Sequence, residues 1–169
     1  MPERALDVVR PLAEKLPAAS LSADDLMRKI CHLLHERLLK YNWVGFYMLE
    51  GGAGGDTLVL GPFAGSMTPH TRIQLNQGIC GAAASSGRTI VVDDVNSDPR
   101  YLACSIETKS EIVVPVFVGG KVVGELDIDS HFPAAFKDDD REFVEYCAGL
   151  VGKALEAESK APQKTATTR

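Results

Sequence analysis

The stretch that decides the fold reads EIVVPVFV-GG-KVVGELDID and covers residues 111–129. Two runs rich in valine and isoleucine flank a Gly-Gly pair, and glycine supplies the positive φ angles that a two-residue hairpin turn needs. The stretch therefore predicts two antiparallel strands, residues 111–118 and 121–129, joined by a turn at Gly119 and Gly120.

Upstream of this hairpin, further β-prone runs are separated by glycine-rich or polar turns. Residues 43–49 (WVGFYML) and 57–60 (TLVL) flank a glycine-rich loop, which predicts a second hairpin. Between the two hairpins we expect four short elements: strands at 71–75 and 89–92, a helix of small residues at 78–86, and one helical turn at 100–105.

Helices are expected at both ends of the chain. Apolar residues recur at helical spacing after Ser22, whose hydroxyl is a suitable N-cap. A last apolar stripe follows Asp138, Asp139 and Asp140, and their carboxylates favour the positive end of a helix dipole. Since helices flank a series of meandering strands, the order of elements predicts an α+β domain, with helices packed on an antiparallel sheet.

One domain is expected, because a chain of 169 residues can bury a sufficient core and no recognisable linker divides the sequence. Its parts are expected as follows: the domain in 1–159, N-terminal helices in 1–40, the sheet and its loops in 41–130, the C-terminal helix in 138–157, and a polar flexible tail in 160–169.

The composition excludes several classes of protein. Hydrophobic residues make up 45% and charged residues 24% of the chain, with a formal net charge of -5, as in ordinary globular proteins. Lysine and arginine do not gather in one region, so nucleic acid and anionic membranes are not expected as partners. The first 16 residues are interspersed with charges, and Pro115 interrupts the longest apolar run. We therefore expect a cytoplasmic protein without a signal peptide or membrane span.

The four cysteines fall into two pairs by context. Cys31 and Cys147 lie on apolar helical patterns and are expected to be buried as small hydrophobic residues. Cys80 lies between two glycines at an expected loop-to-helix junction, where the helix N-terminus would lower the thiol pKa. Cys104 lies in a loop with no apolar period. None of the four forms a CxxC pair, so no metal site is expected.

Three carboxylates alternate along the second strand of the C-terminal hairpin. Strict alternation places Glu125, Asp127 and Asp129 on one face together with Val123, and Val122 on the opposite face. Composition alone favours a solvated face near the end of a strand. The functional interpretation is a small acidic pocket that binds an ammonium group or shares a proton, and could thus supply a general acid near neutral pH.

A set of short motifs occurs in a fixed order along the chain: NWVGFY at 42–47, LGPF at 60–63, GICG at 78–81, DDV at 93–95, Cys104, SEIVVP at 110–115 and GELDIDS at 124–130. This set resembles the free methionine-(R)-sulfoxide reductases, which are single-domain enzymes of GAF fold. The resemblance implies a six-stranded antiparallel sheet with the N- and C-terminal helices packed against it. It also implies reduction of free, not peptide-bound, methionine-(R)-sulfoxide, an activity connected with oxidative stress.

The resemblance further implies the roles of the thiols. Cys104 would be the nucleophile that becomes a sulfenic acid, and Cys80 the resolving thiol that condenses with it to a disulfide. An external dithiol, thioredoxin by resemblance, would then reduce that disulfide. No bound cofactor is implied, and the family suggests a homodimer.

For the substrate pocket, the resemblance points to five residues: Glu111, Asp127, Asp129, Trp43 and Tyr47. Asp127 is expected at the substrate ammonium, with Glu111 and Asp129 near the sulfoxide. The two aromatic residues are candidate walls of the pocket. Which of the three acids donates the proton stays open.

Two other functions are compatible with the same residues. A GAF module could bind a small ligand as a sensor without catalysis, in which case the cysteines would be incidental. A thiol-based peroxide sensor could use both cysteines but would have no use for an acidic pocket. A count of thiols before and after exposure to methionine sulfoxide or to peroxide separates these alternatives.

Overall fold

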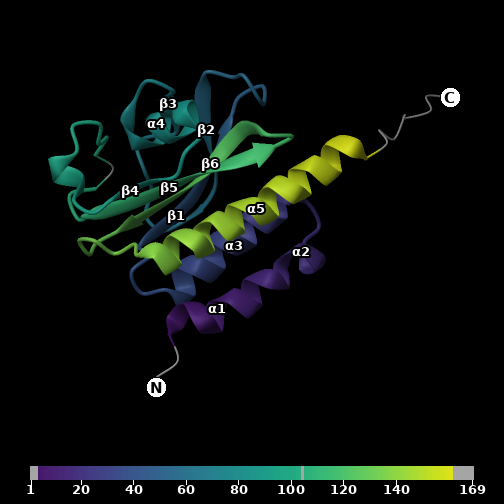
Figure 1. Cartoon of the computed structure of the whole chain (residues 1–169), viewed down its shortest axis with the longest axis horizontal. Coiled ribbons are helices and arrows are strands. Elements are labelled where there is room, and N and C mark those ends of the chain that lie inside the picture. Colours follow the sequence, from purple (N-terminus) through teal and green to yellow (C-terminus); the bar gives the residue numbers. More distant parts are fainter. Residues whose placement is uncertain (1–3, 104, 162–169) are drawn as a thin grey trace.

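The computed structural model describes residues 4–103 and 105–161 of the chain. Six strands form one antiparallel sheet in the order β3-β2-β1-β6-β5-β4 (Figure 1). The strands are β1 Trp43–Leu49, β2 Thr57–Ala64, β3 Arg72–Gln74, β4 Ile90–Val92, β5 Ser110–Val118 and β6 Lys121–Ser130. Strands β1 and β6 thus occupy the middle of the sheet, and the two longest strands, β5 and β6, lie side by side.

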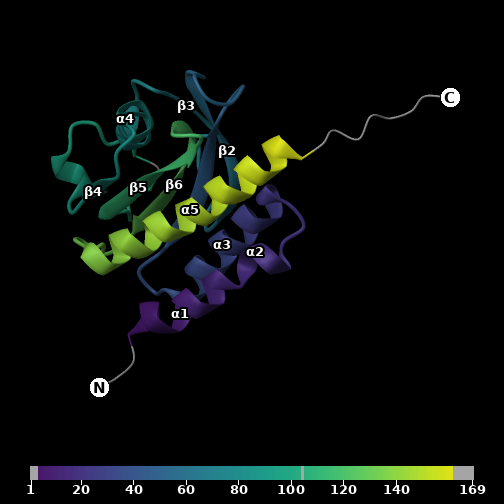
Figure 2. The same cartoon turned by 45° about the vertical axis from the view of Figure 1, so that its right-hand side comes forward.

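Helices cover both faces of this sheet. They are α1 Ala5–Glu14, α2 Leu16–Ala19, α3 Ala23–Arg37, α4 Gly78–Ser86 and α5 Asp138–Lys160, with a short 3₁₀ helix, η1, at Val95–Ser97. Helices α3 and α5 pack side by side on one face, and α1 packs on the outside of this pair (Figures 1 and 2). Helix α4 lies against β5 and β6 on the opposite face.

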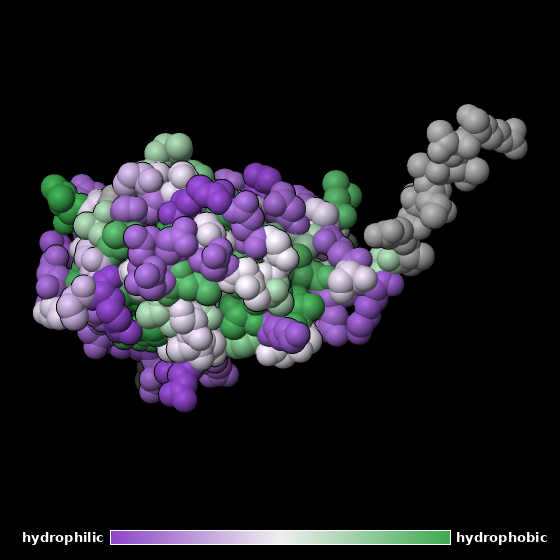
Figure 3. Space-filling model, turned by 90° about the horizontal axis from the view of Figure 1, so that it is seen from above, coloured by the Kyte–Doolittle hydropathy of each residue, from purple (hydrophilic) through white to green (hydrophobic). Residues whose placement is uncertain are grey.

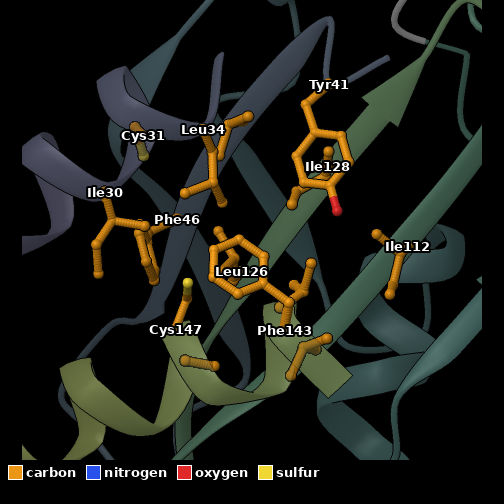
Figure 4. Packing of buried hydrophobic residues seen from close by; sticks show 14 of the residues in the cluster. Ile30, Cys31, Leu34, Tyr41, Phe46, Ile112, Leu126, Ile128, Phe143 and Cys147 are labelled. Atoms are coloured by element: carbon orange, nitrogen blue, oxygen red, sulfur yellow. The ribbon is translucent and has the colours of Figure 1, made fainter. Parts of the chain in front are cut away.

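Each face of the sheet has its own apolar cluster. The larger one fills the space between the sheet and the pair α3 and α5, where Leu126 and Ile128 of β6 meet Phe143 and Cys147 of α5 (Figure 4). The smaller cluster lies under α4 and includes Cys80. Cys31, like Cys147, is fully buried, which confirms the expectation for both residues.

Most expected elements are present because their signals are local. The Ser22 hydroxyl accepts a hydrogen bond from the Asp25 N–H at 3.0 Å and caps α3 as expected. Helix α4 ends at Gly87, which has a φ of 66°. Both hairpins form, although β2 extends to Ala64, four residues beyond the expected end at residue 60.

Two expectations for helices were wrong: one helical turn is absent, and the last helix is longer than expected. The segment 100–103 and residue 105 contain no helix; the Tyr101 N–H instead closes a turn on the Asp98 carbonyl, and the Leu102 side chain packs over Gly78. Helix α5 runs to Lys160 rather than to residue 157, since the next residue, Ala161, precedes a proline and is therefore disfavoured in a helix. Of the expected tail, residues 162–169 lie outside the described residues.

A β-bulge in the C-terminal hairpin makes the expected alternation of side chains between the two faces of β6 partly wrong. The pairing passes from Val116 with Gly124 to Phe117 with Val122, so that Val123 has no partner in the register. This extra residue exchanges the faces of the two valines. Val123 packs against the cluster under α3 and α5, and Val122 packs against the one under α4.

In the part of the chain that the structure describes, no helix is both long and apolar enough to cross a membrane. The face seen from above mixes hydrophilic and hydrophobic residues (Figure 3).

Candidate active site

Three acidic side chains meet where β5 and β6 lie side by side. Asp127 and Asp129 are on one face of β6, and Glu111 of β5 pairs directly with Asp129. One carboxylate oxygen from each of the three lies within 4.8 Å of the others. All three residues are at most 4% exposed. The interpretation of a solvated charged face is therefore wrong, and we refer to these three residues as the acid cluster.

Burial controls the protonation of the acid cluster. It raises the pKa of Asp127 well above its usual range, and the charges of Asp129 and Glu125 raise it further. Burial also raises the pKa of Asp129, while a hydrogen bond with Glu111 lowers it. Because neighbouring buried carboxylates cannot all be ionised together, the cluster retains a proton at a pH where exposed carboxyls have lost theirs. It can therefore act as a general acid.

A cavity of about 70 Å³ opens beside the acid cluster. Asp127 and Asp129 form its acidic side, and Trp43 and Tyr47 form its aromatic side. The remaining lining comes from residues outside the β-sheet: Asn42, Ser66, Met67, Thr68, Ser105, Glu107, Thr108 and His131. Four of the expected pocket residues thus line this cavity, whereas Glu111 lines a second, smaller cavity.

Contacts with neighbouring residues fix the positions of the Trp43 and Tyr47 side chains. The Trp43 ring stacks on Phe63, with centroids 5.7 Å apart, and its Nε1 donates a hydrogen bond to the Ser66 carbonyl at 3.0 Å. The Tyr47 hydroxyl donates to the His70 carbonyl at 2.7 Å. Gly45 leaves the space for the indole, since an added Cβ would lie 2.7 Å from Trp43 Cζ3. The walls of the cavity are therefore largely formed before any ligand enters.

The acid cluster has unused capacity to accept hydrogen bonds. The Oδ1 atoms of Asp127 and Asp129 are buried and have no hydrogen-bond partner within the described part of the chain. Such atoms favour a ligand that carries a positive charge or several N–H donors. By donor type, the three carboxylates could also coordinate a hard divalent cation.

Cys80 lies in the first turn of α4, directly over the acid cluster. Its Sγ donates a hydrogen bond to Asp127 Oδ2 at 3.5 Å. Burial raises the pKa of the Cys80 thiol well above its usual value, and the charges of Asp127 and Glu125 add to this effect. The expectation that the helix N-terminus lowers this pKa was therefore wrong, because loss of solvation and the nearby acids outweigh the partial charge of the helix.

Cys104 lies outside the described residues, but its neighbours border the site. Leu102 lines a small second cavity of about 10 Å³ together with Cys80, and Ser105 lines the larger one. The ring of His70 donates a hydrogen bond from Nε2 to the Ala103 carbonyl at 2.8 Å. Leu102, before Cys104, is thus close to the resolving thiol expected from the sequence, and Ser105, after it, borders the acidic cavity.

Sequence reasoning missed the lining residues that belong to loops. His131, Glu107 and Thr108 reach the cavity from segments next to β6 and β5. His70 contacts the segment before Cys104 from the loop between β2 and β3. No periodicity marks such positions, and only the fold brings them together.

Comparison with known proteins identifies the family. A family model for the GAF domain matches residues 22–155. The free methionine-R-sulfoxide reductase of Saccharomyces cerevisiae is 42% identical over 126 residues, which cover 74% of this chain and 69% of the yeast protein. The Escherichia coli protein of the same name is 39% identical over 123 residues, covering 73% of this chain and 72% of the relative. This chain belongs to the free methionine-R-sulfoxide reductase family.

A solved structure of the family matches the fold of this chain. The X-ray structure of the free methionine-R-sulfoxide reductase from Neisseria meningitidis, in complex with its substrate, matches with a TM-score of 0.83 and 36% identity. The match covers 91% of this chain and 90% of the other. The GAF fold that the ordered motifs predicted is thereby confirmed. The roles of individual residues stay predictions.

Proposed function

We propose that this protein reduces free methionine-(R)-sulfoxide to methionine, with two cysteines and the acid cluster as its chemical groups. Its two relatives from yeast and E. coli carry the name of this activity. The observation on which the proposal depends is the contact between a buried thiol, Cys80, and an acid cluster that borders an aromatic-walled cavity. A thiol and a protonated acid at one cavity are what sulfoxide reduction needs.

Binding of the free amino acid is assigned to Asp127. The buried Oδ1 atoms of Asp127 and Asp129 have no hydrogen-bond partner among the described residues, and neither carboxylate forms an ion pair there. A buried carboxylate without a partner is costly. The ammonium group of a free amino acid would supply that partner, whereas the amide of a peptide-bound residue would not. The acid cluster therefore favours the free substrate over the peptide.

In the first chemical step, Cys104 is the nucleophile. Its thiolate attacks the sulfoxide sulfur while Asp129 or Glu111 donates a proton to the oxygen, which leaves poorly unless it is protonated. The net result is transfer of the protonated oxygen to Cys104 as a sulfenic acid, with release of methionine. The sulfoxide sulfur is reduced and the Cys104 sulfur is oxidised by two electrons.

In the second step, Cys80 condenses with the sulfenic acid to a disulfide and water. An external dithiol of the thioredoxin class then reduces the disulfide and restores both thiols. No bound cofactor takes part in this scheme. Two thiols that must return to the reduced state suit a reducing compartment, so we expect the protein to act in the cytoplasm.

We also propose a homodimer formed through the terminal helices. Val8 of α1 and Leu21, which precedes α3, are large hydrophobic residues that are 43% and 95% exposed on that side of the molecule. A second copy would cover them. Sedimentation equilibrium over a range of concentrations tests this, and a monomer at every concentration would contradict it.

The test of the function is a thiol count under single-turnover conditions. Free methionine-(R)-sulfoxide should consume two thiols per chain and yield one methionine, while the S epimer and a peptide-bound residue should leave the thiols unchanged. A sensor would retain all its thiols with each of these compounds. A peroxide sensor would lose them to hydrogen peroxide and not to the sulfoxide.

A further inference from the structure

His70 lies in the loop between β2 and β3, and its backbone is bonded to the wall of the larger cavity. The His70 N–H donates a hydrogen bond to the Thr68 hydroxyl at 3.1 Å, and the His70 carbonyl accepts one from the Tyr47 hydroxyl at 2.7 Å. Thr68 and Tyr47 both line this cavity. The position of His70 is therefore fixed by residues that would surround the substrate.

The side chain of His70 contacts a different part of the chain. Its Nε2 donates a hydrogen bond to the Ala103 carbonyl at 2.8 Å, and the two residues are 33 positions apart in the sequence. A carbonyl oxygen can only accept, so Nε2 must carry a hydrogen. The neutral ring with its hydrogen on Nε2 and the protonated ring both meet this condition. The bond to Ala103 therefore does not require a charged histidine.

Ala103 comes directly before Cys104, the residue assigned as the nucleophile. Consecutive Cα atoms are about 3.8 Å apart, so a contact that fixes Ala103 restricts the space open to Cys104. One residue earlier, the Leu102 side chain packs over Gly78 of α4. The segment is thus held on two sides, by α4 through Leu102 and by the wall of the larger cavity through His70.

We propose that His70 is a positioning residue for the first chemical step, in which its hydrogen bond to Ala103 holds the segment that carries Cys104 against the wall of the larger cavity. The proposal rests on the proposed function, because it takes Cys104 as the nucleophile. It gives His70 no proton to transfer and no contact with the sulfoxide.

The physical reason is the geometry that nucleophilic attack requires. The residues on either side of Cys104, Ala103 and Ser105, belong to no helix or strand, so backbone hydrogen bonds of regular structure do not fix them. A nucleophile on such a segment loses conformational entropy when it reaches the sulfoxide sulfur. A bond that holds the neighbouring residue lowers this cost before the substrate binds. Its loss should therefore slow the chemical step and leave the affinity for the substrate nearly unchanged.

The second chemical step makes a different demand on the same segment. Cys104 must then meet Cys80, which lies in the first turn of α4, and Leu102 already packs on that helix. Loss of the His70 bond does not remove this contact. We therefore expect disulfide formation to depend much less on His70 than the release of methionine does.

The experiment separates a positioning residue from an acid or base and from a merely structural residue. His70→Gln retains an N–H donor close to the position of Nε2, whereas His70→Leu removes the donor. His32→Leu, at an exposed position of α3, controls for the loss of a histidine elsewhere. Each protein reacts once with free methionine-(R)-sulfoxide, without reductant, over a range of substrate concentrations. Released methionine gives the maximum rate of the first step and the dissociation constant, and the loss of a trappable sulfenic acid gives the rate of the second. Thermal unfolding checks that each variant is folded.

In His70→Leu, the maximum rate of methionine release should fall about 3- to 10-fold, the effect of one neutral hydrogen bond. The dissociation constant and the rate of disulfide formation should stay within about twofold of wild type. His70→Gln and His32→Leu should resemble wild type throughout. The fall in His70→Leu should be the same at about pH 5.5 and about pH 8, because the neutral and the protonated ring both donate. In the unreacted proteins, the amides of residues 101–103 should exchange hydrogen faster in His70→Leu alone.

Each of the following results would overturn the proposal. Unchanged methionine release or unchanged hydrogen exchange in His70→Leu would show that the bond does not position the segment. A fall that His70→Gln shares, or one that differs between the two pH values, would show that His70 acts other than as a simple donor. An equal fall in both chemical steps would indicate a general loosening of the segment. These results concern His70 alone, whereas wild-type protein that released no methionine would contradict the proposed function and this inference with it.

Discussion

The Cys80 thiol donates a hydrogen bond to Asp127 Oδ2 at 3.5 Å, and the same aspartate lines the cavity beside Trp43 and Tyr47. One carboxyl group thus connects a buried thiol with the cavity assigned to the substrate. Because Asp127 contacts both, loss of its charge should affect the binding of the substrate as well as the protonation of Cys80.

Replacement of Asp127 by asparagine should weaken binding of the free amino acid. The ammonium group would lose its charged partner, which is worth about 10- to 100-fold in KM. Steady-state kinetics with free methionine-(R)-sulfoxide measure this. The matched control is Asp129→Asn, in which kcat should fall more than KM rises, since that residue is assigned to the sulfoxide. A small effect of Asp127→Asn on KM would contradict the assignment of the ammonium contact.

The two thiols should separate in single-turnover experiments. Cys104→Ser should abolish the release of methionine, because the nucleophile is gone. Cys80→Ser should release one methionine per chain and accumulate a sulfenic acid that no thiol resolves. The control is Cys31→Ala, whose thiol is buried away from the cavity in the cluster under α3 and α5 and should leave turnover unchanged. If Cys80→Ser eliminated the first turnover, the roles of the two thiols would be reversed.

Activity should fall with rising pH as the acid cluster loses its proton. Burial, the largest cause, raises the pKa of Asp127 and Asp129 above the ordinary value of 3.8. A general acid works only while it is protonated, so kcat/KM should have a descending limb at the raised pKa and not near pH 4. A profile of kcat/KM against pH checks this. In the Asp129→Asn variant that limb should change, and an unaltered profile would indicate that Asp129 is not the donor.

The same raised pKa values make a prediction about stability. A carboxyl whose pKa is higher in the folded than in the unfolded state binds more protons when folded, so folding becomes less favourable as pH rises between the two values. The contribution of Asp127 and Asp129 is therefore greatest below pH 3.8 and declines as pH rises toward their folded-state pKa. Urea unfolding from pH 4 to 8 should show a smaller loss of stability in Asp127→Asn than in wild type. Equal slopes would contradict burial of this carboxyl as an acid.

Gly45→Ala should disturb the aromatic wall. The added Cβ would lie 2.7 Å from Trp43 Cζ3, so the indole must move. We expect a loss of stability of about 1–3 kcal/mol and a higher KM. The matched control is Gly149→Ala in α5, where an added Cβ meets nothing within 4 Å and alanine favours the helix by about 1 kcal/mol. Unchanged kinetics in Gly45→Ala would show that the position of Trp43 does not control the cavity.

Local signals in the sequence were enough for most elements of the fold. The Gly-Gly pair between two β-prone runs predicts the hairpin of β5 and β6, and Ser22 marks the start of α3. These signals act between residues close in sequence, where hydrogen bonding and backbone preference decide the outcome. They failed at Val123, because a bulge arises from the packing of two strands and not from either strand alone.

By itself, the sequence determined that three carboxyl groups of β6 share one face, that cysteines stand at positions 80 and 104, and that the motifs are those of one family. Only the tertiary structure decided that this face is covered rather than solvated. Helix α4, some 45 residues earlier in the chain, provides that cover and brings Cys80 to Asp127. The physical reason is solvation: a carboxyl that is ionised in water can stay neutral when buried, and burial raises the pKa of a thiol further. Alternation along a strand contains no information about what packs on top of it.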